Sequence, residues 1–255
     1  MKYKKSDLIL RYEDRIPAYY VSLNGQIKFY TLAGMLLESA AKHASLLGYG
    51  YPEMMKEKVY WVLSRFHTVV HSYPLMDEIV IIETWPKKVD RLFFLRDYRM
   101  LSSDGRILAE ATSAWLILDG NTGRPKKFED KFNPHELFVA DLHGIEAVPE
   151  KLAVIPEADK QQTIKAMYSD LDINNHVNAV KYIEWIQDFY TEEIYKSQNI
   201  EEFQINYQLE TRFGEEVNVR MKNRQNEDPF DYFEGIRIVD QNPAFRARIK
   251  FGKFE

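Results

Sequence analysis

The chain of 255 residues is 45% hydrophobic, enough to bury one large core or two smaller ones, and two domains are the better starting expectation. Its formal net charge of −5 argues against nucleic-acid binding, which needs a basic face, and the absence of cysteine excludes disulfides, thiolate zinc sites and a cysteine nucleophile. We expect a soluble, cytoplasmic protein, because the N-terminus has no signal-peptide core and no apolar run reaches the ~20 residues of a membrane span.

The first half reads as one long helix followed by an antiparallel meander. Apolar residues recur at helical spacing after Tyr30, and Gly48 ends the pattern because glycine tolerates left-handed backbone geometry. Segments typical of strands follow, separated by turn signals such as SDG at residues 103–105. The predicted strands cover residues 60–70, 78–85, 91–101 and 106–118.

The second half repeats this order after a polar, proline-containing stretch. A helix is predicted over residues 178–196, followed by strands over residues 203–211, 216–223, 231–239 and 244–251. The repetition indicates duplication of one α+β unit, in which a long helix buries its apolar stripe on an antiparallel sheet. We therefore predict two tandem hot-dog domains with their sheets paired edge to edge: residues 1–135, a linker over residues 136–156, and residues 157–255.

The most informative stretch reads DLDINNHVNAVKYI and leads into the second helix. Asp172, Asn174 and His176 alternate there, so in an extended conformation their side chains point to one side while Ile173 and Val177 face the core. Three polar groups then converge at a helix N-terminus. This arrangement suits hydrolysis of a carbonyl compound, because helix-start N–H groups and an Asn amide stabilise an oxyanion while His and a carboxylate move protons or orient water.

Structural interpretations of the same residues stay open on spacing alone. The stretch from Asp170 matches the opening of an EF-hand calcium loop, but its sixth position is Asn175 instead of Gly and its twelfth is Lys181 instead of Glu. An Asn or Asp before an amphipathic helix is often an N-cap, and a lone His is often a hydrogen-bonded structural group.

Residues 170–183 resemble the signature segment of the acyl-ACP thioesterases of plants and bacteria, and the similarity extends to WVLSR at residues 61–65 and to GRILAEATSAW at residues 105–115. The resemblance implies a tandem hot-dog fold whose second domain hydrolyses the thioester while the first largely shapes the acyl pocket. It places the catalytic Asp, Asn and His of the family on Asp172, Asn174 and His176. The family also uses a Glu on the strand after the helix, for which Glu210 is the candidate, although the family's neighbouring Cys is Thr211 here.

An internal comparison supports this division of roles. We aligned the two halves with a shift of 150 positions, so that position 172 falls on position 22. Asp172, Asn174 and His176 then align with Ser22, Asn24 and Gln26. The first half thus lacks both titratable groups. Candidate pocket liners in that half, which ordinary core packing explains as well, are Leu36, Leu37, Phe93, Phe94 and Trp115.

The predicted function is hydrolysis of fatty acyl-ACP thioesters to free fatty acid and holo-ACP, without a metal or organic cofactor. The expected partner is an acyl carrier protein that carries a phosphopantetheine-linked acyl chain, and basic residues that would steer it are Lys87, Lys88, Arg91, Arg124, Lys126 and Lys127. An acyl-CoA thioesterase, a non-hydrolytic acyl-thioester-binding hot-dog protein and a related dehydratase stay open, as does a homodimer. The pattern does not distinguish general-base catalysis by Glu210 from an acyl-Asp172 anhydride.

Overall fold

Two units of similar architecture make up the chain, Met1–Pro149 and Glu150–Glu255. The computed structural model describes residues 5–126, 137–139, 141–225 and 227–253. Lys127, one of the basic residues named above, lies outside the described residues. In the described part of the chain, no helix is long and apolar enough to cross a membrane.

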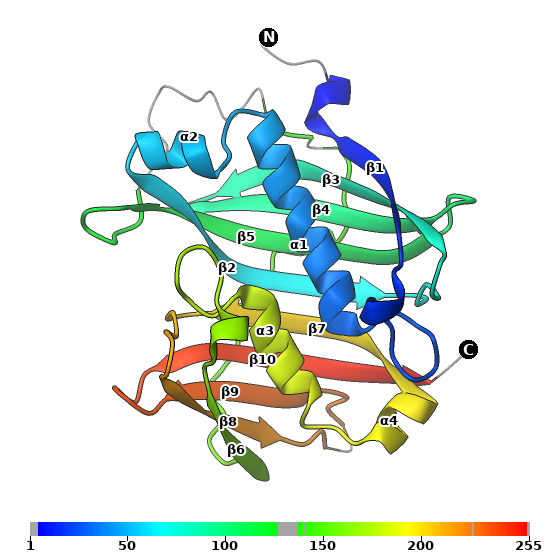
Figure 1. Ribbon diagram of the computed structural model, residues 1–255, viewed down its shortest axis with the longest axis vertical. Coiled ribbons are helices and arrows are strands. Elements are labelled where there is room, and N and C mark those ends of the chain that lie inside the picture. The colour runs from blue at the N-terminus through cyan, green and yellow to red at the C-terminus, as the bar shows by residue number, and fades with distance from the viewer. Residues whose placement is uncertain (1–4, 127–136, 140, 226, 254–255) are drawn as a thin grey trace. The chain divides into compact units, whose positions relative to one another are not determined.

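The first unit is an antiparallel sheet with helix α1 lying across one face (Figure 1). The strands lie in the order β1-β3-β4-β5-β2, and Leu32 and Leu36 on the apolar stripe of α1 are fully buried. Gly48 takes a positive φ of 80° directly after this helix, as predicted. The elements are β1 Leu10–Arg15, α1 Phe29–Leu46, α2 Tyr51–Lys56, β2 Val59–Val70, β3 Ile79–Asp90, β4 Phe93–Ser102 and β5 Ile107–Asp119, with short 3₁₀ turns at Lys5–Leu8 and Ala18–Tyr20.

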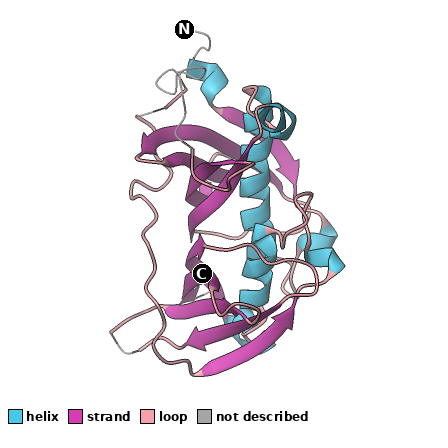
Figure 2. Cartoon of the chain, turned by 90° about the vertical axis from the view of Figure 1, so that its left-hand side faces the viewer, coloured by secondary structure: helices cyan, strands magenta, loops and turns pink. Residues whose placement is uncertain are grey.

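The second unit repeats this topology, with strands in the corresponding order β6-β8-β9-β10-β7. Figure 2 shows, for each unit, the helix on one side of its strands. The ring of Tyr182 holds α3 on the sheet through contacts with Tyr207 and Phe245, at centroid distances of 6.0 and 5.3 Å. The elements are β6 Lys160–Lys165, a 3₁₀ turn at Tyr168–Asp170, α3 Ala179–Gln187, α4 Glu192–Ser197, β7 Gln198–Tyr207, β8 Glu216–Lys222, β9 Asp231–Arg237 and β10 Pro243–Lys253.

The second helix is shorter than predicted. The single helix expected over residues 178–196 is wrong, because α3 ends at Gln187 and α4 begins at Glu192. At the break, the Tyr190 hydroxyl donates to Asp231 Oδ2 over 2.9 Å and its ring packs 4.7 Å from that of Phe251. These tertiary contacts outweigh the helical propensity of the segment, since such propensities are worth well under ~1 kcal/mol per residue.

The predicted strands are confirmed in order and overlap the observed ones, but the strand predicted over residues 203–211 runs instead from Gln198 to Tyr207, and β1 and β6 were not predicted. β6 has the sequence KQQTIK and is almost entirely exposed, so it lacks the apolar alternation that indicates a strand. It pairs with β8 just as β1 pairs with β3, which gives each unit a polar edge.

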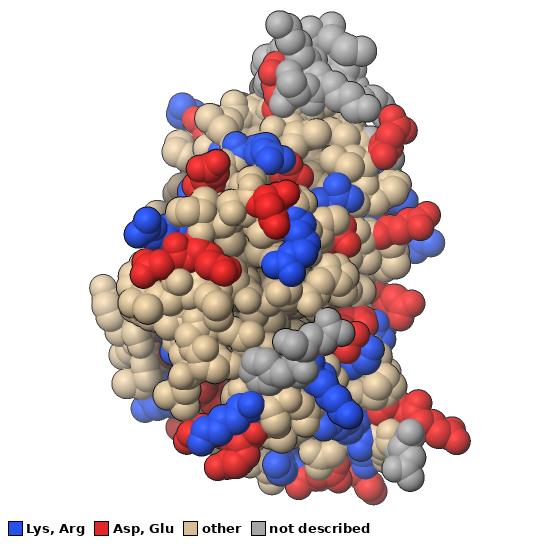
Figure 3. All heavy atoms as spheres, turned by 90° about the vertical axis from the view of Figure 1, so that its right-hand side faces the viewer, with Lys and Arg blue, Asp and Glu red and all other residues tan. Residues whose placement is uncertain are grey.

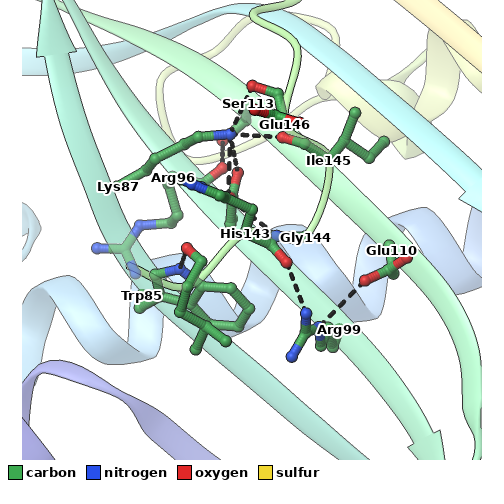
Figure 4. Close-up of polar contacts among 12 residues, drawn as sticks. Trp85, Lys87, Arg96, Arg99, Glu110, Ser113, His143, Gly144, Ile145 and Glu146 are labelled. Carbon is green, nitrogen blue, oxygen red and sulfur yellow. Dashed lines mark hydrogen bonds and ion pairs between the residues drawn. The ribbon is translucent and has the colours of Figure 1, made fainter. Parts of the chain in front are cut away.

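The chain that leaves the first unit is fastened to its sheet by a buried ion pair (Figure 4). Lys87 is only 1% exposed, and its Nζ lies 3.2 Å from Asp97 Oδ2. The same ammonium group donates to the carbonyls of Ile145 and Glu146, and Asp97 accepts the Gly144 N–H over 3.0 Å. Because both charges are paired and hydrogen-bonded in the interior, residues 144–146 are held against the sheet of the first unit.

Candidate active site

The three polar residues singled out in the sequence lie on one tight turn that precedes α3. The Asp172 N–H donates to the His176 carbonyl over 2.9 Å and closes the turn. Inside it, Asp172 Oδ1 accepts the Asn174 N–H over 2.8 Å. Asn175 takes a φ of 61°, in the left-handed region that Asn tolerates better than most residues. The turn therefore gathers all three residues within five positions.

The extended conformation predicted for this stretch is wrong. Ile173 was expected in the core but is 78% exposed at the tip of the turn, whereas Val177, at 6% exposure, does face the core. Local hydrogen bonding by Asp172 offers the backbone an alternative to a strand, which is how Asp and Asn side chains favour turns.

Glu210 reaches the turn from the loop that follows β7. The Val177 N–H donates to the Thr211 carbonyl over 2.8 Å, which fixes this loop beside the turn. His176 Nε2 then lies 3.9 Å from Glu210 Oε1, a separation for an ion pair but too long for a hydrogen bond. The Glu210 side chain is 49% exposed and also faces Arg212, whose Nη2 lies 3.6 Å away. The structure thus brings together His176 and the carboxylate of Glu210 from distant parts of the chain.

Glu210 does not lie on a strand, contrary to the prediction. β7 ends at Tyr207, because the N–H groups of Gln208 and Leu209 both turn to the Ala244 carbonyl, over 2.8 and 3.3 Å. The chain then leaves the sheet and crosses to the turn.

The neighbouring residues of the motif have structural partners. Asn178 caps α3, since its Oδ1 accepts the Val180 N–H over 2.9 Å. Lys181 pairs with Glu184 at 2.6 Å and Asp170 at 3.6 Å, and Asp170 also accepts the Met167 N–H over 2.7 Å. Asn178 therefore fits the N-cap interpretation that the sequence left open, and Asp170 and Lys181 tie the turn to the helix.

The first unit contains the same turn without the titratable groups. The Ser22 N–H donates to the Gln26 carbonyl over 2.8 Å, and Gly25, with a φ of 77°, stands where Asn175 stands in the second unit. The shift of 150 positions is thus confirmed in hydrogen bonding. Asn24 binds Gln26 over 3.0 Å, so the polar side chains here satisfy one another.

A counterpart of Glu210 escaped sequence comparison. The Ile27 N–H donates to the Pro74 carbonyl over 3.0 Å, just as Val177 donates to Thr211, so Tyr73 occupies the position of Glu210. The offset here is 137 (211 minus 74), and an ungapped shift of 150 does not find it. The sequence feature that could have revealed this correspondence is the polar turn that precedes the next strand in each half, at residues 75–78 and 212–216.

Comparisons with known proteins agree with this architecture. Residues 9–134 match the acyl-ACP thioesterase N-terminal domain, and residues 155–253 match the acyl-ACP thioesterase C-terminal domain. A chloroplastic palmitoyl-acyl carrier protein thioesterase of Gossypium hirsutum is 30% identical over 221 residues, which cover 82% of this chain and 54% of the relative. The chain spans about half the length of the curated relatives it matches.

Solved structures extend the likeness to three dimensions. The structure of an acyl-ACP thioesterase from Bacteroides thetaiotaomicron is 26% identical, with a TM-score of 0.88 that covers 98% of this chain and 100% of the other. A 12:0-ACP thioesterase from Umbellularia californica shares the fold, at 22% identity and a TM-score of 0.85 over 97% and 95% of the two chains. The fold is that of a tandem hot-dog protein. By both domain matches, the chain belongs to the acyl-ACP thioesterase family.

Proposed function

We propose that this protein hydrolyses fatty acyl-ACP thioesters to free fatty acid and holo-ACP, with Asp172, Asn174, His176 and Glu210 as its catalytic residues. The observation that carries the proposal is the approach of His176 Nε2 to Glu210 Oε1, at 3.9 Å, beside the turn that holds the other two. A carboxylate base, an imidazole and an amide donor are the groups that hydrolysis of a carbonyl compound needs, for proton transfer and for stabilising the oxyanion. The family of the chain supports the same chemistry.

In the proposed reaction, the thioester carbonyl lies beside the start of α3. The Asn174 amide and N–H groups at the helix start stabilise the oxyanion, and Glu210 takes a proton from the attacking water. The C–S bond then breaks, and the leaving sulfur receives a proton through His176. Asp172, whose Oδ1 holds the Asn174 N–H, keeps Asn174 in place.

The surface around the turn suits an acyl-phosphopantetheine arm. Tyr168, Ile173 and Phe213 are large, exposed apolar residues on the loops that surround the candidate residues. We assign the acyl pocket to the N-terminal domain of residues 1–135 and the chemistry to the C-terminal domain of residues 157–255, joined by residues 136–156. A cysteine-free chain fits the reducing cytoplasm, which is the location we propose.

The test compares variants of the two copies of the turn. Asp172→Ala, which removes the acceptor that holds the Asn174 N–H, His176→Ala and Glu210→Gln should each lower kcat on acyl-ACP by about 100-fold or more, because proton transfer and oxyanion stabilisation each contribute on that order. The matched controls in the first unit, Ser22→Ala and Gln26→Ala, should keep kcat within about twofold, because they occupy the same turn without titratable groups. Folded second-unit variants with wild-type turnover would contradict the site assignment.

The carrier is tested with matched substrates. Acyl chains of one length are presented on ACP and on CoA, and we expect a higher kcat/KM for acyl-ACP. A preference for acyl-CoA would favour an acyl-CoA thioesterase, and stoichiometric binding without product release would favour a non-hydrolytic binding protein.

A further inference from the structure

Two buried hydroxyl groups without hydrogen-bond partners lie behind the candidate site. Tyr182 on α3 is 3% exposed and Thr211 in the loop after β7 is 0% exposed, and within the described part of the chain neither side-chain oxygen completes a hydrogen bond, although the two groups are close enough to interact. Each such group costs roughly 1–3 kcal/mol, because it gives up its bonds to water without replacement. Buried polar groups without partners are uncommon in folded proteins, so two of them beside one candidate site ask for an explanation.

The first unit shows that the fold does not need these hydroxyls. By the same correspondence that pairs the two turns, Leu32 occupies the position of Tyr182 and Pro74 that of Thr211. Both residues of the first unit are apolar and buried. The two hydroxyls therefore accompany the titratable residues in the copy of the turn that carries them.

The Tyr182 hydroxyl lies close to the chain that presents Glu210. Burial raises the pKa of Tyr182 to about 12, the hydroxyl and N–H of Thr211 lower it in part, and the Glu210 charge raises it. The phenol is thus protonated at neutral pH and faces Thr211, although no hydrogen bond is complete. Thr211 in turn adjoins Glu210 and holds the turn through its carbonyl and the Val177 N–H.

We propose that Tyr182 and Thr211 are positioning residues for Glu210. A hydrogen bond between their hydroxyl groups, incomplete in the free protein, forms in the substrate complex and draws the loop against α3, which closes the 3.9 Å gap between Glu210 and His176 to hydrogen-bonding distance. Hydrogen bonds at active sites often tighten in this way only when substrate is bound. This inference rests on the function proposed above.

Tyr182→Phe and Thr211→Val remove the hydroxyls and keep the shape of the side chains. Each variant should lower kcat on acyl-ACP by about 10- to 100-fold with KM unchanged, which is the scale of a misplacement near 1 Å. The double variant should lose no more than either single variant, because the two hydroxyls act through one bond. Thr211→Ser should restore kcat. The melting temperature of Tyr182→Phe should stay within about 3 °C of wild type or rise, because the lost group is unpaired.

The matched control is Thr68→Val in the first unit, where the threonine hydroxyl is also fully buried and has no hydrogen-bond partner among the residues that the structure describes; this variant should leave kcat unchanged. Additive losses in the double variant, or a Tyr182→Phe variant with kcat within about twofold of wild type, would overturn the positioning role. A melting temperature of Tyr182→Phe more than about 3 °C below wild type would also overturn the positioning role, because it would show that the hydroxyl makes a structural hydrogen bond in the free protein. If His176→Ala is inactive while Tyr182→Phe is fully active, the positioning role is refuted and the proposed function still stands.

Discussion

Single residues inside the first unit show how burial sets charge in this protein. His43 on α1 is almost completely buried, and its Nδ1 accepts a hydrogen bond from Arg96 Nη1 of β4 over 3.0 Å. Its other ring nitrogen lies 3.3 Å from the Asp7 carbonyl. Burial, and then the charge of Arg96, lower the pKa of His43 to about 4. The imidazole is therefore neutral in the native protein at pH 7.

This lowered pKa predicts acid sensitivity. An unfolded His titrates near 6.5, so below that pH the unfolded state binds a proton that the native state refuses until about pH 4. The stabilisation is fully present above pH 6.5 and is lost as the pH falls toward 4. From pH 7 to pH 5 the loss attributable to His43 should be about 2 kcal/mol in the free energy of unfolding, measured by urea denaturation.

His43→Gln is the control for this prediction, because Gln offers an acceptor to Arg96 but does not titrate. The variant should lose about 2 kcal/mol less than wild type over the same pH interval. Equal losses in the two proteins would show that another group causes the acid sensitivity.

At the scale of elements, the two copies of the helix start differently. Asn178 caps α3 by accepting the Val180 N–H, whereas Lys28, at the same position before α1, has no side-chain cap hydrogen bond. α3 has only nine residues, against 18 for α1, so it has fewer internal hydrogen bonds to hold its first turn. The cap therefore matters more in the unit that carries the candidate site.

Asn178→Ala should lower the free energy of unfolding by about 1 kcal/mol, while Asn178→Asp should retain most of it, because Asp also accepts at an N-cap. Lys28→Ala is the matched change in the first unit and should alter stability by less than about 0.5 kcal/mol. Urea denaturation of the three variants measures both values. A loss for Lys28→Ala equal to that for Asn178→Ala would argue against a role for the cap.

At the scale of the whole molecule, the net charge of −5 is the small difference between 34 basic and 39 acidic residues. Figure 3 shows basic and acidic side chains interspersed on the face in view. Lys87, predicted to steer a carrier protein, is buried with Asp97, so that prediction is wrong for this residue. The remaining described candidates for steering are exposed, namely Lys88, Arg91, Arg124 and Lys126.

A Lys88→Glu, Lys126→Glu double variant tests whether these residues attract an acidic carrier. Its kcat/KM on acyl-ACP should fall several-fold at low ionic strength and approach the wild-type value at high salt, since screening removes steering between exposed charges. An acyl N-acetylcysteamine thioester, which carries no charge, is the control substrate and should react equally with both proteins. A decrease that persists at high salt would mean that the two lysines act in some other way.

Sequence by itself determined the duplicated order of helix and strands, the place of Asp172, Asn174 and His176 just before the second helix, and the family. These features depend on periodicity and on neighbours within a few residues, which a sequence displays directly. The edge-to-edge pairing of the two sheets stays a prediction.

Tertiary structure alone decided the contacts between distant residues. The approach of Glu210 to His176, the break after α3 and the burial of Lys87 depend on the path of the chain. The partners in these contacts lie 34, 41 and 10 positions apart, too far for a pattern of neighbouring residues to record them, and only folding brings them together.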